Sequence, residues 1–403
     1  MSARLLVISA SSDFDAAVAK GNLALLNDFD EGGYFAEVII AFPFAARSRR
    51  VQISERVTVL DIGWEWLPGA RASRAVKRLL APVQLWRIVR MLARTVRHHH
   101  IDIIRATDPL FAGPIGWAVS RLTRRPFCVS IHADFDKRHA LSGTNAGADV
   151  LGSRALARPV EQFVLRRADL VMPIRESLRE YALTRGVLSN RIRVIPHGAD
   201  LELFVTPSAV DVRTLFRLSR SARIISFAGR LIQENYVGDV LRLATAVGKV
   251  RPDVIFLILG GGPDSDQIQA AVAASPVLQQ VVRLVGSQPR PVVAAVRQAS
   301  SVSLCLMGGF SLIEACAAAS PVVAYDVEWH AELIRDGISG FLVAECDLNT
   351  LRSRVEQLLD DTELGSRLGQ AARELALQRH SLGAAAQIKR RCYDELLTAR
   401  QAG

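Results

Sequence analysis

One run of this 403-residue sequence combines a glycine loop, a helix start and an acidic side chain. Gly308-Gly309 precede an alanine-rich segment that carries Glu314 and stops at Ser320-Pro321. A helix that begins after a glycine loop exposes backbone N–H groups and the positive end of its dipole, so it suits a phosphate. We expect Glu314 in the first turn, where its carboxylate can accept hydrogen bonds from sugar hydroxyls. The run alone is equally typical of an ordinary strand–helix–strand crossover with a solvated acid.

Two more motifs follow predicted strands of the same half. Arg230 comes after Ile224–Ala228, and the turn Gly260–Pro263 comes after Val254–Leu259. The carboxyl ends of parallel strands line one edge of a doubly wound sheet, so both motifs should lie beside the helix that carries Glu314. A guanidinium grips phosphate, and glycines let backbone N–H groups approach it. Together they predict a site for a diphosphate-bearing ligand. Neither GxGxxG nor a Walker A run is present, which disfavours a dehydrogenase or a P-loop enzyme.

Predicted strands and helices alternate along the whole chain, which indicates an α/β protein with doubly wound parallel sheets. In the first half the expected strands are Arg4–Ala10, Glu37–Ala41, Val57–Asp61, Ile101–Arg105, Pro126–Ile131, Leu170–Pro173 and Arg193–Pro196. In the second half they are Ile224–Ala228, Val254–Leu259, Val282–Val285, Val302–Leu306 and Val322–Tyr325. The segment Pro196–Asp200 interrupts the pattern. We therefore expect one domain at residues 1–203 and a second at 204–383, with a helix at about 384–403 packing back on the first.

Composition narrows the class of protein. The five cysteines are scattered and form no CxxC pair, which indicates reduced thiols in a cytoplasmic protein and argues against a disulfide framework or a zinc site. No apolar run approaches the roughly 20 residues needed to span a bilayer. The net charge is +10, and residues 47–97 hold twelve basic residues against three acidic ones. The partner of the first half is therefore expected to be anionic.

The basic excess lies mostly in one segment, Arg71–Arg97, which mixes Arg and Lys with Leu, Val, Ile and Trp86. Such a helix can lie in the interface of an anionic bilayer, and Trp64, Trp66 and Leu67 could add an anchor. The alternative is an amphipathic helix that packs on its own domain with solvated arginines. We favour contact with an anionic membrane surface. No nucleic-acid-binding fold or base-stacking module accompanies the charge, so nucleic acid is disfavoured as a partner.

Taken together, these segments resemble a retaining GT-B glycosyltransferase of the large family-four group. The matching segments, in the family's order, are Ile192–Phe204, Ser226–Leu231, Leu257–Pro263, Arg283–Ser287, Ser311–Asp326 and Asp336–Val343, with looser matches at Pro126–Asp136 and Arg166–Ser177. The resemblance implies two facing Rossmann-like domains with a cleft between them. It also implies a nucleotide-sugar donor on the second domain and an acceptor on the first.

The resemblance implies a role for each matching residue. Arg230 would bind the diphosphate, Glu314 the ribose hydroxyls, and His132 would approach the donor sugar; the alternative for His132 is a histidine at the edge of the core. The other residues expected to border the substrate are Gly229, Asn235, Gly261, Gly262, Gly286, Ser287, Gly309, Phe310, Ser311, Leu312 and Gly21. No metal ligand is implied.

The sequence departs from the family at three places. Asn235 stands where the family has a lysine, Leu306 stands where it has a second glutamate, and Lys20-Gly21 replace a glycine pair. The lost lysine removes a charge-assisted contact of about 1.5–3 kcal/mol to the diphosphate. We expect the backbone of Gly308-Gly309, supplemented by Ser311, to stand in for the missing carboxylate.

The predicted function is transfer of a hexosyl unit, with retained configuration, from a nucleotide-diphosphate sugar to a glycan or lipid-linked acceptor in cell-surface polysaccharide or glycolipid synthesis. Neither a cofactor nor a metal is expected. The enzyme is expected to be cytoplasmic and peripheral on the inner face of the membrane. One alternative is a nucleotide-sugar 2-epimerase, for which only His132, Asp134 and Asp136 offer acid or base groups. The other is a scaffold protein impaired by the lost lysine and glutamate.

Overall fold

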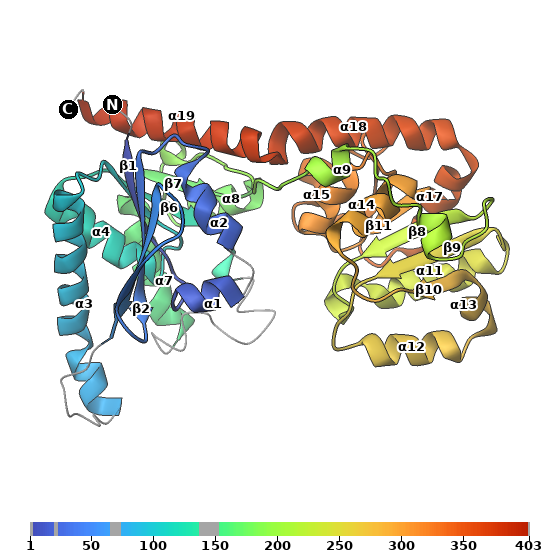
Figure 1. Cartoon of the computed structure of the whole chain (residues 1–403), viewed down its shortest axis with the longest axis horizontal. Coiled ribbons are helices and arrows are strands. Elements are labelled where there is room, and N and C mark those ends of the chain that lie inside the picture. The colour runs from blue at the N-terminus through green and yellow to red at the C-terminus, as the bar shows by residue number, and fades with distance from the viewer. Residues whose placement is uncertain (1–2, 20–22, 65–73, 137–152, 402–403) are drawn as a thin grey trace. The chain divides into compact units, whose positions relative to one another are not determined.

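The computed structural model describes residues 3–19, 23–64, 74–136 and 153–401 and divides the chain into two compact units (Figure 1). Unit 1 comprises Met1–Pro196 and Ala386–Gly403, and unit 2 comprises His197–Ala385. The change of unit comes earlier than residue 203 because the segment after Pro196 packs in unit 2. Ala199 forms a bridge with Ser381, and Phe204 is fully buried in the core of unit 2.

Unit 1 is built on a seven-stranded sheet in the order β3-β4-β2-β1-β5-β6-β7. The strands are β1 (Arg4–Ile8), β2 (Glu37–Ala45), β3 (Arg49–Gln52), β4 (Val57–Gly63), β5 (Ile103–Ala106), β6 (Phe127–Ile131) and β7 (Leu170–Pro173). All neighbours are parallel except β3, which runs antiparallel to β4.

The prediction of a strand at Arg193–Pro196 is wrong. This segment follows β7 through bonds from the Arg193 N–H to the Val171 carbonyl, at 3.0 Å, and from the Ile195 N–H to the Pro173 carbonyl, at 2.8 Å. It forms only one isolated bridge, between Ile192 and Val171, and so lacks a regular ladder.

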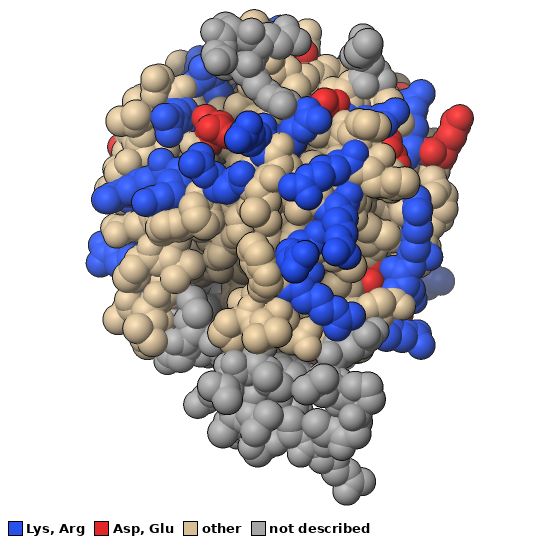
Figure 2. Space-filling model, turned by 90° about the vertical axis from the view of Figure 1, so that its left-hand side faces the viewer, with Lys and Arg blue, Asp and Glu red and all other residues tan. Residues whose placement is uncertain are grey.

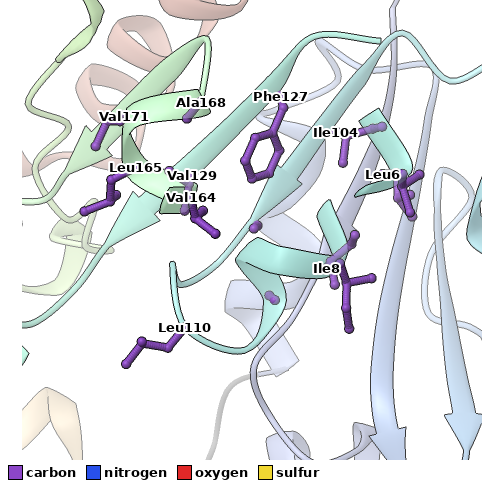
Figure 3. Packing of buried hydrophobic residues seen from close by; sticks show 14 of the residues in the cluster. Leu6, Ile8, Ile104, Leu110, Phe127, Val129, Val164, Leu165, Ala168 and Val171 are labelled. Carbon is purple, nitrogen blue, oxygen red and sulfur yellow. The ribbon is translucent and has the colours of Figure 1, made fainter. Parts of the chain in front are cut away.

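Helices cover both faces of this sheet. They are α1 (Phe14–Ala19), α2 (Leu23–Asn27), α3 (Arg74–His98), α4 (Ala112–Thr123), α7 (Arg154–Arg167), α8 (Glu176–Thr184) and α19 (Leu382–Gln401), with short 3₁₀ turns η1 (Asp28–Asp30) and η2 (Ser189–Arg191). On one face, side chains of β1, β5 and β6 pack with those of α7, such as Val164 and Leu165 (Figure 3). On the other face, Tyr393 and Leu396 of α19 join the core.

Unit 2 is built on a six-stranded parallel sheet in the order β10-β9-β8-β11-β12-β13. Its strands are β8 (Arg223–Ala228), β9 (Val254–Leu259), β10 (Val282–Leu284), β11 (Val302–Cys305), β12 (Val322–Tyr325) and β13 (Phe341–Val343). Because β9, β8 and β11 are neighbours, the loops that follow them leave the sheet side by side. The expected doubly wound α/β fold is thus confirmed for both units.

The helices of unit 2 begin where the sequence provides caps. They are α9 (Glu202–Val205), α10 (Val212–Leu215), α11 (Val237–Gly248), α12 (Ser265–Ala273), α13 (Pro276–Val281), α14 (Arg290–Ala299), α15 (Phe310–Ala317), α16 (His330–Leu333), α17 (Leu348–Asp360) and α18 (Thr362–His380), with the 3₁₀ turn η3 (Gln233–Asn235). Ser275 caps α13, Asp347 caps α17 and Asp361 caps α18, each accepting a bond from a backbone N–H of the first turn. No helix in the described part of the chain is long and apolar enough to cross a membrane.

Candidate functional site

The loops after β8 and β9 meet through their backbones at the carboxyl edge of the unit 2 sheet. The Gly229 N–H donates to the Leu259 carbonyl at 3.1 Å, and the Leu231 N–H donates to the Gly261 carbonyl at 3.1 Å. A Cβ on Gly260 would lie 1.8 Å from the Gly229 oxygen, and Gly260 has a φ of +134°. Only glycine fits there, so the close approach of the two loops depends on Gly260.

The loop after β10 joins the same edge. The Gly260 N–H donates to the Gly286 carbonyl at 2.8 Å. The Ser287 hydroxyl lies 3.3 Å from the place that a Cβ on Gly261 would take, and open space surrounds Gly286 on its Cβ side. A Cβ on Gly262 would meet the Leu231 oxygen at 2.3 Å. The structure therefore brings together the expected residues Gly229, Gly261, Gly262, Gly286 and Ser287.

Helix α15 starts at this edge as well. Gly309 precedes its first residue, and the Ser311 hydroxyl donates to the Ala228 carbonyl at the end of β8, at 2.6 Å. The Leu312 N–H donates to the Gly309 carbonyl at 3.2 Å, and its side chain is fully buried. The Phe310 ring is 46% exposed and lies 5.6 Å from the His197 ring. The first turn of α15 is thus fixed to the strand that leads to Arg230.

Glu314 does not lie in the first turn, as the sequence led us to expect, because the helix begins at Phe310 and the first turn holds no acidic residue. It follows Ser311 by three residues, and residues at this spacing share a helix face. Its side chain is 20% exposed, and one carboxylate oxygen lies 3.3 Å from Nη2 of Arg290. Burial raises the pKa of the Glu314 carboxyl, although Arg290 and Arg297 oppose this shift.

Arg297 is a fully buried guanidinium beneath the start of α15. Its Nη2 donates to the Ser311 hydroxyl at 2.7 Å, and its Nη1 lies 3.4 Å from the Ser226 hydroxyl. Ser226 in turn bonds with Ser300 and Ser303, so hydroxyl groups solvate the charge. Among the described residues no carboxylate pairs with Arg297, and its Nε has no hydrogen-bond partner. Within the described part of the chain, a positive charge without a salt bridge therefore lies directly below the helix start, and Glu314 is near enough to interact with it electrostatically.

Our reading of the sequence missed both arginines of α14. Arg290 and Arg297 are seven residues apart, two turns of one helix, so they share a face. This spacing, directly after the loop Gly286–Pro289, was the available signal.

The expectation that the backbone of Gly308-Gly309, supplemented by Ser311, replaces the missing carboxylate stays a prediction, although two of these groups already have partners within unit 2. The Gly308 N–H donates to Nε2 of His330 at 2.9 Å, and the His330 Nδ1–H in this tautomer donates to the Tyr325 carbonyl at 2.8 Å. The Ser311 hydroxyl is likewise engaged, with Ala228. Open space surrounds Gly309 on its Cβ side. Leu306, at the place of the family's glutamate, is fully buried.

Arg230 follows β8 and is exposed. The Asn235 side chain, at the place of the family's lysine, donates from Nδ2 to the Arg230 carbonyl at 2.8 Å. Asn235 therefore supports the backbone of the turn that carries Arg230 and supplies no charge of its own.

In unit 1, His132 directly follows β6 and is exposed, while Gly21 lies outside the described residues. The loop after β6 is held by Asp136, which accepts a bond from Nε of Arg154 at 2.7 Å and another from Arg185. Burial by itself would raise the pKa of Asp136, but these two arginines lower it below its usual value. Glu161, completely buried, accepts from Nη2 of Arg154 at 2.6 Å. The network was not predicted from the sequence, since its members are far apart in the chain.

Potential metal ligands do not gather in the described part of the chain: no three His, Cys, Asp or Glu side chains form a group that could hold an ion.

Two family descriptions match the chain. "Glycosyl transferases group 1" matches residues 216–375, and "Glycosyl transferase 4-like domain" matches residues 23–198. The two matches together cover most of both units. The chain belongs to this family of glycosyltransferases.

Similar proteins of known activity support the family assignment. The 2-deoxystreptamine glucosyltransferase of Streptomyces kanamyceticus is 27% identical over 261 residues, which are 62% of this chain and 65% of that protein. The D-inositol 3-phosphate glycosyltransferase of Nocardia farcinica is 28% identical over 84% of this chain and 80% of that protein. A poly(ribitol-phosphate) alpha-N-acetylglucosaminyltransferase of Staphylococcus aureus is 25% identical over 44% of this chain and 37% of that protein.

Solved structures share the fold of this glycosyltransferase. HepE of Anabaena in complex with UDP matches with a TM-score of 0.70 at 18% identity and covers 97% of this chain and 100% of that one. The sucrose-phosphate synthase of Thermosynechococcus elongatus matches with a TM-score of 0.70 at 18% identity and covers 98% of this chain and 100% of that one. The GT-B class expected from the sequence is therefore confirmed.

His330 predicts how the stability of unit 2 depends on pH. Burial lowers the pKa of His330 below its ordinary value of 6.5, so below that pH the unfolded chain binds more protons than the folded one. Stability should be complete above about pH 6.5 and fall as the pH drops toward 5. The substitution His330→Gln should flatten this slope in urea unfolding followed by circular dichroism, whereas exposed His98→Gln should not. An unchanged slope in His330→Gln would contradict the assignment.

Proposed function

We propose that this glycosyltransferase moves a hexosyl unit from a nucleotide-diphosphate sugar to its acceptor with retention of the anomeric configuration. The observation that carries the proposal is the meeting of three loops, after β8, β9 and β10, with the start of α15 at one edge of the unit 2 sheet. Arg230, the glycine turn after β9 and the amino end of α15 can there surround a diphosphate. UDP in the HepE structure supports the same ligand class for this fold.

The leaving diphosphate gains negative charge as the glycosidic bond breaks. Arg230 can accept part of it through a charge-assisted pair, and the N–H groups at the start of α15 add the helix dipole. The buried charge of Arg297 makes the electrostatic potential at the start of α15 more positive, and its hydrogen bond to Ser311 holds it in position before the reaction. Such preorganised stabilisation needs no metal and no cofactor. Glu314, held by Arg290, can accept hydrogen bonds from the ribose hydroxyls.

We propose a glycan or lipid-linked acceptor for cell-surface polysaccharide or glycolipid synthesis. The Staphylococcus aureus relative acts on poly(ribitol-phosphate), as its name says, which supports a polymeric acceptor. We propose that the enzyme is cytoplasmic and attached to the inner face of the membrane, where it could reach a lipid-linked acceptor.

Helix α3 supports such attachment with its exposed face. Its apolar residues Ile88, Leu92 and Val96 are buried in the core of unit 1, so packing on its own domain accounts for that face. The opposite face leaves Trp86 52% exposed, among exposed arginines such as Arg90. Figure 2 shows many Lys and Arg side chains on this side of the molecule and few acidic ones. Aromatic and basic groups on one exposed face are typical of an interfacial helix.

A scaffold protein without catalysis is the second candidate, because Leu306 is buried where the family has a carboxylate and Asn235 supplies no charge. The nucleotide-sugar 2-epimerase is less well supported, since Asp136, one of its few acid or base candidates, is held by two arginines.

The role of Arg230 can be tested by calorimetry with a panel of nucleoside diphosphates and their sugars. Arg230→Ala should weaken the best ligand by about tenfold or more, because a charge-assisted bond contributes about 1.5–3 kcal/mol. Exposed Arg220→Ala, also in unit 2, should bind as the unchanged protein does. Binding of no nucleotide at all would favour the scaffold. Equal binding by Arg230→Ala would exclude a role of Arg230 in binding the diphosphate. In a separate assay, release of nucleoside diphosphate with a lipid-linked acceptor would distinguish a transferase from an epimerase.

Arg297 should act through its charge. Arg297→Met removes a buried cation that forms no salt bridge with the described residues, so the variant avoids the large cost of leaving a buried carboxylate unpaired. The same variant should lose about 1–2 kcal/mol of nucleoside diphosphate affinity, as expected for a charge several ångströms away at an effective dielectric of about 20. Arg297→Lys should keep most of that affinity. If both variants lose affinity equally, Arg297 supports the Ser311 hydroxyl and its charge is unimportant.

Membrane attachment can be tested by co-sedimentation with vesicles that contain phosphatidylglycerol. Replacing Arg87, Arg90 and Arg94 by Gln should weaken binding roughly hundredfold, since each basic residue near an anionic surface contributes about 1 kcal/mol. A matched triple variant, Arg220, Lys249 and Arg367 to Gln, removes three exposed charges from unit 2 and should bind normally. Undiminished sedimentation of the α3 variant would refute the proposal.

A further inference from the structure

Unit 1 contains a pocket of about 700 Å³ at the amino edge of its sheet. The end of α4, the starts of β6 and β7, the segment 190–193 and helix α19 line it. His132, the residue of unit 1 expected to approach the donor sugar, follows the other, carboxyl end of β6, so this pocket lies at the opposite edge of the sheet from it. Its size is that of pockets that hold small ligands.

Arginine dominates the lining. Among the described residues that line the pocket, the arginines are Arg121, Arg124, Arg125, Arg191 and Arg193, and the acids are Asp169 and Glu395. One acid is used by the fold, because Asp169 accepts the Phe127 N–H at 2.8 Å.

Two of the five arginines have acidic partners. Arg193 pairs with Glu395 at 2.9 Å, and Arg125 lies 3.5 Å from Asp102. Among the residues that the structure describes, Arg121, Arg124 and Arg191 pair with no acid. The pocket thus keeps three positive charges that the protein leaves uncompensated.

The fold of unit 1 does not by itself explain why five arginines line one pocket. The carboxyl end of α4 favours basic residues such as Arg121, because they interact well with the helix dipole. That reason does not extend to Arg191 and Arg193, which follow α8 and reach the same pocket from another segment. Arg124 ends α4 with a φ of +55°, a conformation that glycine adopts more readily. Like charges at one concavity repel each other, so the arrangement suits a ligand of opposite charge.

We propose that this pocket binds a ligand that carries one or more phosphate groups. Guanidinium groups match phosphate with forked, charge-assisted hydrogen bonds, and arginines from two segments can hold such a group from two sides. The phosphate belongs to a soluble metabolite or to a lipid headgroup. The site is distinct from the donor site in unit 2 and does not depend on the transferase proposal.

Hydrogen–deuterium exchange of the full chain can test the site, because it reports where a ligand protects the backbone. Sodium pyrophosphate is one probe, and phosphatidylcholine vesicles with and without phosphatidylglycerol are the other. Peptides covering residues 120–126 and 189–194 should be protected. The triple variant Arg121, Arg124 and Arg191 to Gln should raise the half-protecting concentration by about tenfold or more. The charge-matched unit 2 variant, Arg220, Lys249 and Arg367 to Gln, should leave it unchanged.

Each outcome decides the proposal. Protection by pyrophosphate that is lost in the pocket variant supports a soluble phosphate ligand. Protection only by vesicles with phosphatidylglycerol, again lost in the pocket variant, supports a lipid headgroup. No protection by either probe, or equal protection in the pocket variant, overturns the site. Since the peptides of the donor site are read separately, binding of pyrophosphate by unit 2 cannot be mistaken for this result.

Discussion

The close approach of two backbone loops determines the site in unit 2. A Cβ on Gly260 would lie 1.8 Å from the Gly229 oxygen, and one on Gly262 would lie 2.3 Å from the Leu231 oxygen. The turn that carries Arg230 therefore requires residues without a side chain at positions 260 and 262 of the neighbouring loop. The bond from Ser311 to the end of β8 then brings the start of α15 to the same edge. Main-chain packing therefore fixes where Arg230 and the start of α15 lie relative to each other.

At two positions where the family has a charged residue near the site, this chain has a neutral one. Asn235 supports the turn after β8 as a neutral side chain, and Leu306 belongs to the core. Two arginines of α14 supply positive charge instead: Arg290 holds Glu314, and Arg297 lies below α15. Burying a guanidinium without a salt bridge is costly, and the serine hydroxyls around Arg297 offset part of this cost. A cation kept under these conditions is more readily explained by an anionic ligand than by stability.

Those features that depend on local sequence could be predicted. Buried parallel strands read as apolar, β-branched runs, so most strands of both sheets were located correctly. The glycines after β8, β9 and β10 also signalled their loops. Features that depend on distant contacts could not be predicted. The bond between Gly308 and His330 and the second-turn position of Glu314 depend on how the loop before α15 packs. The segment after η2 runs along β7 without forming the expected strand. Its sequence could not show this, because a strand is defined by its hydrogen bonds to a neighbouring strand.

The arginines of unit 1 fall into two groups, and the difference indicates what each group is for. Inside the unit, Arg154 pairs with Glu161, Arg185 pairs with Asp136, and Arg105 lies 3.5 Å from Glu31. Burial makes an unpaired charge costly, so the fold supplies these carboxylates. At the amino edge, Arg121, Arg124 and Arg191 line one pocket without such partners in the described part of the chain. These three side chains are exposed, so water can solvate them and the fold needs no carboxylate there. Their gathering at one concavity, where like charges repel, is what an anionic ligand from outside the chain would explain.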